Sequence, residues 1–187
     1  MRRPAVATVE TDATADLLVR IKRHSDGSAS LTATRRDGST TWQRQRGSLG
    51  LVFPPHDLTH FAVETTLGMA RGFFGLLADG WEITDFAQPW PRGTPPDEAL
   101  VVELIVGFFD SDRRHGNTWS AEEFAEHAAT YVAAREATHH TVFPRPRVLT
   151  QAEIDAIRAS RDALLAQWHA VPPGGELVLR YQKPQAP

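Results

Sequence analysis

Cysteine is absent from this chain of 187 residues. Its absence excludes disulfide bonds, thiolate metal ligands and cysteine nucleophiles. Lysine is also scarce, because only Lys22 and Lys183 occur and arginine supplies the rest of the positive charge. A chain without cysteine is compatible with a reducing compartment, and we expect a bacterial-type cytoplasmic location.

Long apolar runs are missing too. No segment approaches the about 18–20 consecutive apolar residues of a membrane span. The N-terminal Arg2-Arg3 pair is followed by Glu10 and Asp12 rather than by the apolar core of a secretory signal. The sequence therefore predicts no membrane partner.

Three sequence motifs of common enzyme classes do not occur. These are the glycine-rich phosphate loop, the G-x-G-x-x-G dinucleotide fingerprint and the G-x-S-x-G nucleophile elbow. Their absence argues against nucleotide hydrolysis, dinucleotide redox chemistry and α/β-hydrolase chemistry.

The composition is that of an ordinary globular protein, with 41% hydrophobic and 23% charged residues. Residues 1–15 are rich in alanine and threonine without periodicity, and we expect a loose N-terminal segment there. Residues 16–187 are long enough to bury a core, and we expect them to form a single domain.

The pattern of the chain changes from strands to helices and back. Alternating apolar residues separated by Asp-Gly turns predict three antiparallel strands within residues 16–46. A strand at residues 176–181 needs this meander as its partner, because a lone strand leaves backbone groups unpaired. Helices are expected from His56 or Leu58 to Ala78 and over residues 97–109, 120–136 and 150–170, with a short strand at residues 81–86. The sequence predicts an α+β fold in which this small antiparallel sheet packs against about four helices.

The most informative motif is His56-Asp57-Leu58-Thr59-His60, which resembles the H-E-x-x-H signature of zinc hydrolases with one position altered. Residues four apart share one face of a helix, so His56 and His60 can bind one divalent ion such as zinc. Asp57 or Glu64 would then act as the catalytic general base beside a metal-bound water. The third ligand stays open among Glu64, Glu103, Glu123, His127, His139 and His140.

Glycines follow this motif within the expected helix. On a wheel of about 100° per residue, Gly68, Arg71 and Gly72 share the face of His60 and Glu64. Glycine costs about 1 kcal/mol in a helix interior, so several on one face indicate close approach by a backbone or a ligand. Arg71, Gly68 and Gly72 are therefore candidate binding residues.

A purely structural interpretation of the same residues is also open. Asp57 follows Pro55 and can serve as the N-cap or first-turn acid of the helix. His56 would then lie outside the helix, and the two histidines would not share a face. His60 and Glu64 would form an ordinary i, i+4 pair.

The N-terminal strands carry a different signal. Basic residues and one tryptophan fall on the expected sheet: Arg20, Lys22, Arg35, Arg36, Arg44, Arg46 and Trp42. Nucleic-acid platforms combine such charges with several stacking aromatics. Only Trp42 is available here and the net charge is −3, so we expect no nucleic-acid partner. The basic strands are interpreted as a complement to the acidic remainder of the chain.

Two functional hypotheses follow. The first is a binding or accessory domain that holds an unidentified protein or small molecule at a polar site around His56, His60 and Glu64. The second is a metal-dependent hydrolase that uses the altered motif. The first is favoured, because the motif names only two metal ligands and Asp57 is one methylene shorter than glutamate.

Overall fold

The computed structural model describes residues 15–185 of the chain, and its four strands form one antiparallel sheet in the order β3-β2-β1-β4. The strands are β1 (Leu17–Arg23), β2 (Ala29–Arg35), β3 (Thr40–Gln45) and β4 (Glu176–Tyr181). β4 pairs with β1, which confirms the predicted partner of the C-terminal strand and the α+β fold. The predicted loose segment lies outside the described residues except for Ala15.

Tight turns explain why the first three strands form a meander. Gly27 and Gly38 have φ angles of 80° and 85°, which a residue with a side chain rarely adopts. In each turn an aspartate just before the glycine accepts a backbone hydrogen bond two residues on, from Ser28 to Asp26 and from Ser39 to Asp37. The turns therefore fix the register of the sheet.

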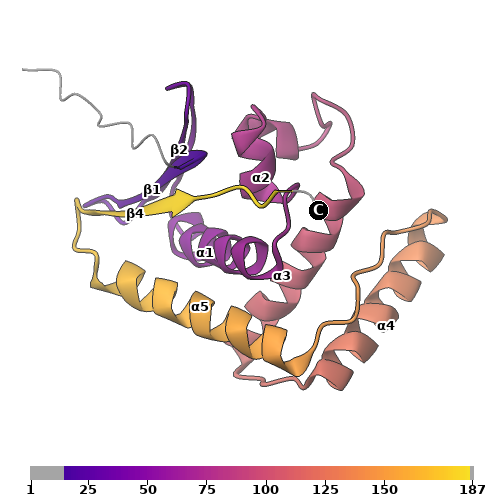
Figure 1. Ribbon diagram of the computed structural model, residues 1–187. Helices are drawn as coiled ribbons and strands as arrows, with labels where there is room; N and C mark the ends of the chain where they lie inside the picture. Colours follow the sequence, from indigo (N-terminus) through magenta and orange to yellow (C-terminus); the bar gives the residue numbers. More distant parts are fainter. Residues whose placement is uncertain (1–14, 186–187) are drawn as a thin grey trace, which may run out of the picture.

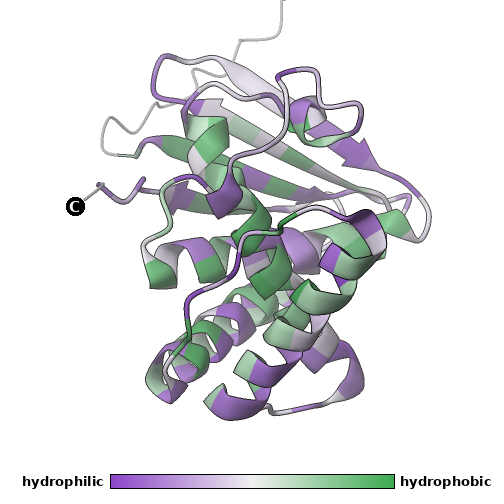
Figure 2. Ribbon diagram, turned by 90° about the vertical axis from the view of Figure 1, so that its right-hand side faces the viewer, coloured by the Kyte–Doolittle hydropathy of each residue, from purple (hydrophilic) through white to green (hydrophobic). Residues whose placement is uncertain are grey.

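One face of the sheet is buried, and hydrophobic and hydrophilic residues alternate along its strands (Figure 2). Leu31 on β2 lies opposite Ile21 on β1 and Gln43 on β3. The inner face is thus apolar at its centre and becomes polar at the β3 edge, where Gln43 and Gln45 are successive residues on this face. This polar edge reaches the candidate site.

Five α-helices and one 3-10 helix complete the described part of the chain (Figure 1). They are α1 (Leu49–Leu67), α2 (Phe73–Ala78), the 3-10 helix η1 (Ile83–Phe86), α3 (Asp97–His115), α4 (Ala121–His139) and α5 (Gln151–Ala170). Capping boxes are present at the N-termini of α4 and α5. α3 and α4 run further than predicted, to His115 and His139.

The helix predicted from His56 or Leu58 to Ala78 is wrong in both bounds. α1 begins at Leu49 and continues through Pro54 and Pro55, and it ends at Leu67 because Gly68 adopts a left-handed conformation with φ 66°. A separate short helix, α2, follows. The strand predicted at residues 81–86 is instead η1, whose start is fixed by reciprocal hydrogen bonds between Glu82 and Asp85.

α1 lies at the centre of the molecule, between the sheet and α5, and it also contacts α2 and α3 (Figure 1). It therefore contributes to both apolar clusters. Leu58 packs with the inner face of the sheet, whereas Val63 packs with α3 and α5. Because α1 is enclosed on several sides, its polar residues are buried as well and need partners inside the protein.

Most of the basic residues of the sheet have acidic partners within the chain. Four ion pairs join Arg20 to Glu176, Arg35 to Glu82, Arg36 to Asp16 and Arg44 to Asp26. Three of these four acids belong to the strands or to the residues next to them rather than to the helices. The charges are therefore balanced largely within the sheet region.

Candidate functional site

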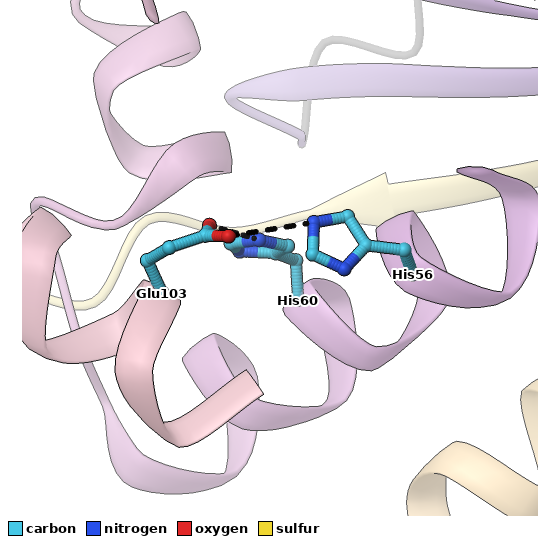
Figure 3. A group of neighbouring side chains, drawn as sticks. All are labelled: His56, His60 and Glu103. Atoms are coloured by element: carbon cyan, nitrogen blue, oxygen red, sulfur yellow. Dashed lines mark hydrogen bonds and ion pairs between the residues drawn. The ribbon is translucent and has the colours of Figure 1, made fainter. Parts of the chain in front are cut away.

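Two elements bring three metal-capable side chains together. His56 and His60 project from the same face of α1, and Glu103 reaches them from α3 (Figure 3). One potential ligand atom from each residue lies within 4.8 Å of the others. The chain therefore contains a group that could hold a metal ion, and Glu103 is the member that the motif did not specify.

The helix start decides this geometry. Because α1 begins at Leu49, His56 is helical and shares a face with His60, and the interpretation of Asp57 as an N-cap is wrong. The two prolines before His56 are buried in the second turn of the helix. Pro55 cannot donate the hydrogen bond that the carbonyl of Leu51 would receive, but Leu51 is exposed and water can replace it.

His60 lies between two carboxylates. Its Nε2 is 3.0 Å from Oε2 of Glu103, and its Nδ1 is 3.4 Å from Oε1 of Glu64 without making a hydrogen bond. Burial acts to lower the pKa of His60. The hydrogen bond to Glu103 and the neighbouring Glu64 outweigh this effect and raise the pKa to about 10. Without a metal ion, His60 is an imidazolium that balances these two acids.

His56 also lies between two carboxylates, one near each ring nitrogen. Its Nδ1 lies 2.9 Å from Oδ2 of Asp110, and its Nε2 lies 3.8 Å from Oε1 of Glu103. Thr59 donates a hydrogen bond of 3.1 Å to the other oxygen of Asp110. Burial acts to raise the pKa of Asp110. The hydrogen bond with His56, together with the interactions with Thr59 and Arg113, outweighs burial and lowers this pKa. Asp110 therefore stays a carboxylate.

Both imidazoles thus present Nε2 toward Glu103 and turn Nδ1 toward a largely buried carboxylate. The side chains of Glu64 and Asp110 are 0% and 10% exposed, respectively. In metal sites, a carboxylate behind a histidine fixes the orientation and tautomer of the ring and increases its basicity. Glu64 and Asp110 occupy this position for the two histidines.

The spacing of the three side chains fits a small metal ion after a modest contraction. A tetrahedral zinc ion with ligands at about 2.0–2.2 Å separates its ligand atoms by roughly 3.3 Å. The separations of 3.0 and 3.8 Å from Glu103 to the two histidines start at different oxygens of its carboxylate, and one ligand atom from each residue lies within 4.8 Å of the others, so the group must contract to hold an ion. The Glu103 side chain is 61% exposed, so it can adjust while the buried His60 stays in place.

Glu103 itself is strongly acidic. Desolvation acts to raise its pKa, but the hydrogen bond and the charge of His60, together with His56, lower it to about 2. An ionised carboxylate beside two imidazoles is a ligand set of two nitrogens and one oxygen. Such a set suits zinc and other first-row divalent ions.

The group opens on a cavity of about 500 Å³. Its walls combine the site residues with apolar and aromatic side chains from several elements: His56, Asp57, His60, Glu103, Gln43, Gln45, Phe53, Phe73, Ile83, Phe86, Ala87, Trp90, Pro95, Ala99 and Leu100. No lysine or arginine is among them. The amide of Gln45 donates to that of Gln43 over 3.0 Å, and both side chains belong to the cavity wall.

Asp57 lies on the same wall. It is 5% exposed, and its burial raises its pKa to about 7, although the nearby histidines act in the opposite direction. It occupies the position after the first histidine that glutamate has in the zinc-hydrolase signature. Its catalytic role stays a prediction.

Glu64 does not reach the cavity. It is fully buried, and its Oε2 accepts hydrogen bonds from the backbone N–H groups of Phe74 and Gly75 at 3.0 and 3.2 Å. Gly72 lies against the same carboxylate, since a Cβ at this position would be 2.5 Å from Cδ of Glu64. A close approach therefore occurs at Gly72, but by a side chain of this protein rather than by a backbone or a ligand, whereas a Cβ at Gly68 would meet nothing within 4 Å.

The other candidate binding residues also lie off the cavity wall. The single helical face predicted for Gly68, Arg71 and Gly72 does not exist, because α1 ends before Gly68. Arg71 is exposed, and its backbone N–H donates to Glu98. A binding role for these residues stays a prediction without support from the cavity.

Asp110 is the site residue that the sequence interpretation missed. The helix predicted over residues 97–109 stops just before it, whereas α3 continues past it and buries it against His56. Its spacing of seven residues from Glu103 places both on one side of α3. That spacing would have indicated it if the length of the helix had been known.

Comparison with protein-family models, with curated proteins and with solved structures gives no match for this chain. Among the described residues, no helix is long and apolar enough to cross a membrane. Any functional assignment must therefore be argued from the site itself.

Proposed function

We propose that the protein is a metal-dependent hydrolase in which His56, His60 and Glu103 hold one divalent ion. The convergence of these three side chains carries the proposal, because both rings offer Nε2 and have a carboxylate behind Nδ1. Two histidines and one glutamate form the ligand set of several catalytic zinc sites, which keep a coordination position open for water. Within residues 15–185, no other group of three histidine, aspartate or glutamate side chains converges in this way.

A bound ion would supply a water molecule of lowered pKa as the nucleophile. The remaining roles fall to residues of the cavity. Asp57 shares its wall with both histidines and is the proposed proton acceptor. Gln43 and Gln45 are suited to a neutral polar group of the substrate, such as an amide or ester. Because the cavity is largely apolar and has no lysine or arginine on its wall, we propose an uncharged apolar substrate.

Metal titration tests the first part of this proposal. Protein stripped with a chelator should bind about one equivalent of Zn²⁺ or Co²⁺. The bound Co²⁺ should give visible absorption bands whose intensity indicates a low coordination number. His60→Ala and Glu103→Gln should weaken binding by at least about 100-fold, and Asp110→Asn by roughly 10–100-fold. His139→Ala, which changes an exposed histidine on α4, is the matched control. Undiminished binding in His60→Ala would contradict the assignment.

Activity tests the second part. We expect zinc-dependent cleavage of uncharged aryl or alkyl esters and amides, lost in His60→Ala and restored in wild-type protein by adding zinc back after chelation. Circular dichroism of each variant separates loss of the site from loss of the fold. Metal binding without turnover on any such substrate would leave a metal site but overturn the hydrolase.

A non-catalytic binding domain is the second candidate. It is favoured by one observation, namely that His60 and Glu103 already satisfy each other at 3.0 Å without an ion. In this alternative, the cavity binds a small apolar ligand, and the ion pair of His60 and Glu103 only stabilises the packing of α1 against α3. Ligand binding that is insensitive to chelator and to zinc would support it.

A further inference from the structure

A second cavity lies beside the first. It has a volume of about 380 Å³, and Leu100 and Glu103 belong to the walls of both cavities. α3 forms its floor with Leu104, Gly107 and Phe108, and α4 contributes Tyr131 and Arg135 on the opposite side. Its size falls within the range of about 300–1,000 Å³ that is usual for small-molecule sites.

Aromatic rings give this cavity flat apolar walls. The ring of Phe108 meets those of Trp119 and Tyr131 edge-on, with centroid distances of 5.8 and 6.0 Å. Trp119 in turn stacks on His127 at 4.5 Å. Edge-on packing holds the rings in fixed orientations, and Phe108, Trp119 and Tyr131 all belong to the wall of the cavity.

Arg135 places a positive charge at the rim of these walls. Its guanidinium lies 4.9 Å from the centroid of the Phe143 ring, and it donates one hydrogen bond of 3.4 Å to the hydroxyl of Tyr131. No carboxylate within residues 15–185 forms an ion pair with it. The neighbouring acid, Glu136, is already bound to Arg145 and to the backbone N–H of Phe143. Most donors of Arg135 are thus left for a ligand.

Gly107 gives an independent indication that the space is kept open. It lies in the interior of α3, where glycine costs about 1 kcal/mol relative to alanine. A Cβ at this position would meet no atom within 4 Å, so no contact inside the described chain requires glycine. The empty space beside it belongs to the second cavity. Space for a ligand would explain why position 107 holds glycine, because no packing contact requires it.

We propose that this second cavity is a binding site for a small amphipathic monocarboxylate. Its apolar body lies against Phe108 and Trp119, and its carboxylate is bound by Arg135, whose planar guanidinium can donate two parallel hydrogen bonds. The acidic Glu103 at the other end of the cavity repels the carboxylate and so sets the orientation of the ligand. This proposal is independent of metal binding and of catalysis.

A matched pair of probes tests the proposal. 4-Phenylbutyrate and 4-phenylbutanamide have the same shape and differ in charge. Binding is followed by calorimetry and by the NMR signal of the Trp119 indole N–H, assigned with Trp119→Phe. A chelator is present throughout, so that the carboxylate cannot bind a metal ion at His56 and His60. We expect the butyrate to bind at least about 10-fold more tightly than the amide, as for a hydrogen bond to a charged group.

Variants separate the second cavity from the first. Arg135→Gln should reduce the affinity for the butyrate to that for the amide. Gly107→Leu keeps a good helix former in α3 but fills the cavity, so it should abolish binding of both probes while circular dichroism stays unchanged. Gly107→Ala provides a milder variant if the leucine disturbs the fold, and it should weaken both probes. Phe53→Ala changes a residue that lines the first cavity but not the second, and it should leave the binding of both unchanged.

Several results would overturn the proposal. Equal affinity of the two probes, or unchanged affinity in Arg135→Gln, would show that the charge of Arg135 is not used. Loss of binding in Phe53→Ala would place the ligand in the first cavity. No saturable binding of either probe at roughly 10 mM would exclude a site of this class.

Discussion

Nε2 of His60 lies 3.0 Å from Oε2 of Glu103, a residue 43 positions further along the chain. The contact joins the buried central helix α1 to α3, and it does so at the wall of the larger cavity. The same pair therefore links the packing of two helices, the protonation of a buried imidazole and the capacity to hold a metal ion.

Glu103→Gln should change the protonation of His60. In metal-free wild-type protein the pKa of His60 is about 10, raised against burial by Glu103 and Glu64. Removing the Glu103 charge should bring this pKa well below 10, since burial then has less opposition. The pH dependence of the His60 imidazole NMR signals measures it. Glu126→Gln, on an exposed position of α4, should leave the titration unaltered.

The same pair should impose a pH window on stability. The raised pKa of His60 contributes stability that is complete below pH 6.5 and lost as the pH rises through about 10. The lowered pKa of Glu103 contributes stability that is complete above pH 4.5 and lost as the pH falls through about 2. The difference in unfolding free energy between wild type and Glu103→Gln should thus be largest between pH 4.5 and pH 6.5.

We expect this difference to be only about 1 kcal/mol, because Glu103 is largely exposed and solvent screens the pair. Urea unfolding of metal-free protein between pH 3 and pH 10 measures it. A difference that keeps growing above pH 8 would contradict the ion pair as its cause.

Asp57→Asn should stabilise the metal-free protein at alkaline pH. Burial raises the pKa of Asp57 from 3.8 to about 7, so the wild type loses stability as the pH rises through 7 and the buried carboxyl ionises. Asparagine stays neutral. We expect little difference near pH 4 and a gain of about 1–3 kcal/mol at pH 8, at roughly 1.4 kcal/mol per pKa unit at most.

The proposed role of Asp57 in catalysis adds a second readout for this variant. If Asp57 accepts the proton, the zinc-loaded variant should lose about 10²–10⁴-fold in kcat while it retains zinc. A variant that is more stable and fully active would remove Asp57 from the mechanism.

Glu64→Gln should loosen the start of α2. The buried Glu64 carboxylate accepts the backbone N–H groups of Phe74 and Gly75 and also faces Nδ1 of His60. An amide offers only one acceptor oxygen, so we expect a loss of about 1–3 kcal/mol in unfolding free energy. Hydrogen exchange of the Phe74 and Gly75 amides should accelerate. Unchanged stability with lost activity would instead favour the catalytic role predicted for Glu64.

Local signals in the sequence were sufficient for much of the fold. The glycines at positions 27 and 38 mark turns because other residues avoid positive φ, and the caps at Ser120 and Thr150 mark helix starts through hydrogen bonds three residues apart. The pairing of β4 with the N-terminal meander followed from the need of a lone strand for a partner, whereas the choice of β1 within the meander did not. Each of these inferences depends on residues close in sequence or on one open sheet edge.

The site required information of a different kind. His56 and His60 could be paired because their spacing is helical, but Glu103 comes from another helix whose packing angle no local pattern encodes. The break at Gly68 was missed because apolar residues continue at helical spacing into α2. Asp110 was missed because its burial depends on contact with α1. Burial of a polar residue is a property of the assembled helices.

Gly72 and Gly107 are both glycines at or within helices, and the structure predicts opposite effects for their replacement by alanine. At Gly72, a Cβ would lie 2.5 Å from Cδ of Glu64, and this side chain cannot move without losing its hydrogen bonds to α2. Gly72→Ala should therefore cost about 1–3 kcal/mol, as overpacking does in other cores.

At Gly107, a Cβ would meet nothing within 4 Å, so Gly107→Ala should gain up to about 1 kcal/mol from helix propensity alone. Urea unfolding of the two variants under the same conditions measures both effects. If Gly72→Ala were as stable as wild type, Glu64 would have room to turn away from α2, and its position behind His60 would not be fixed by packing. If Gly72→Ala destabilises the protein and Gly107→Ala stabilises it, the lack of a side chain at Gly72 fixes the position of Glu64. That position in turn fixes the orientation of His60 toward the cavity.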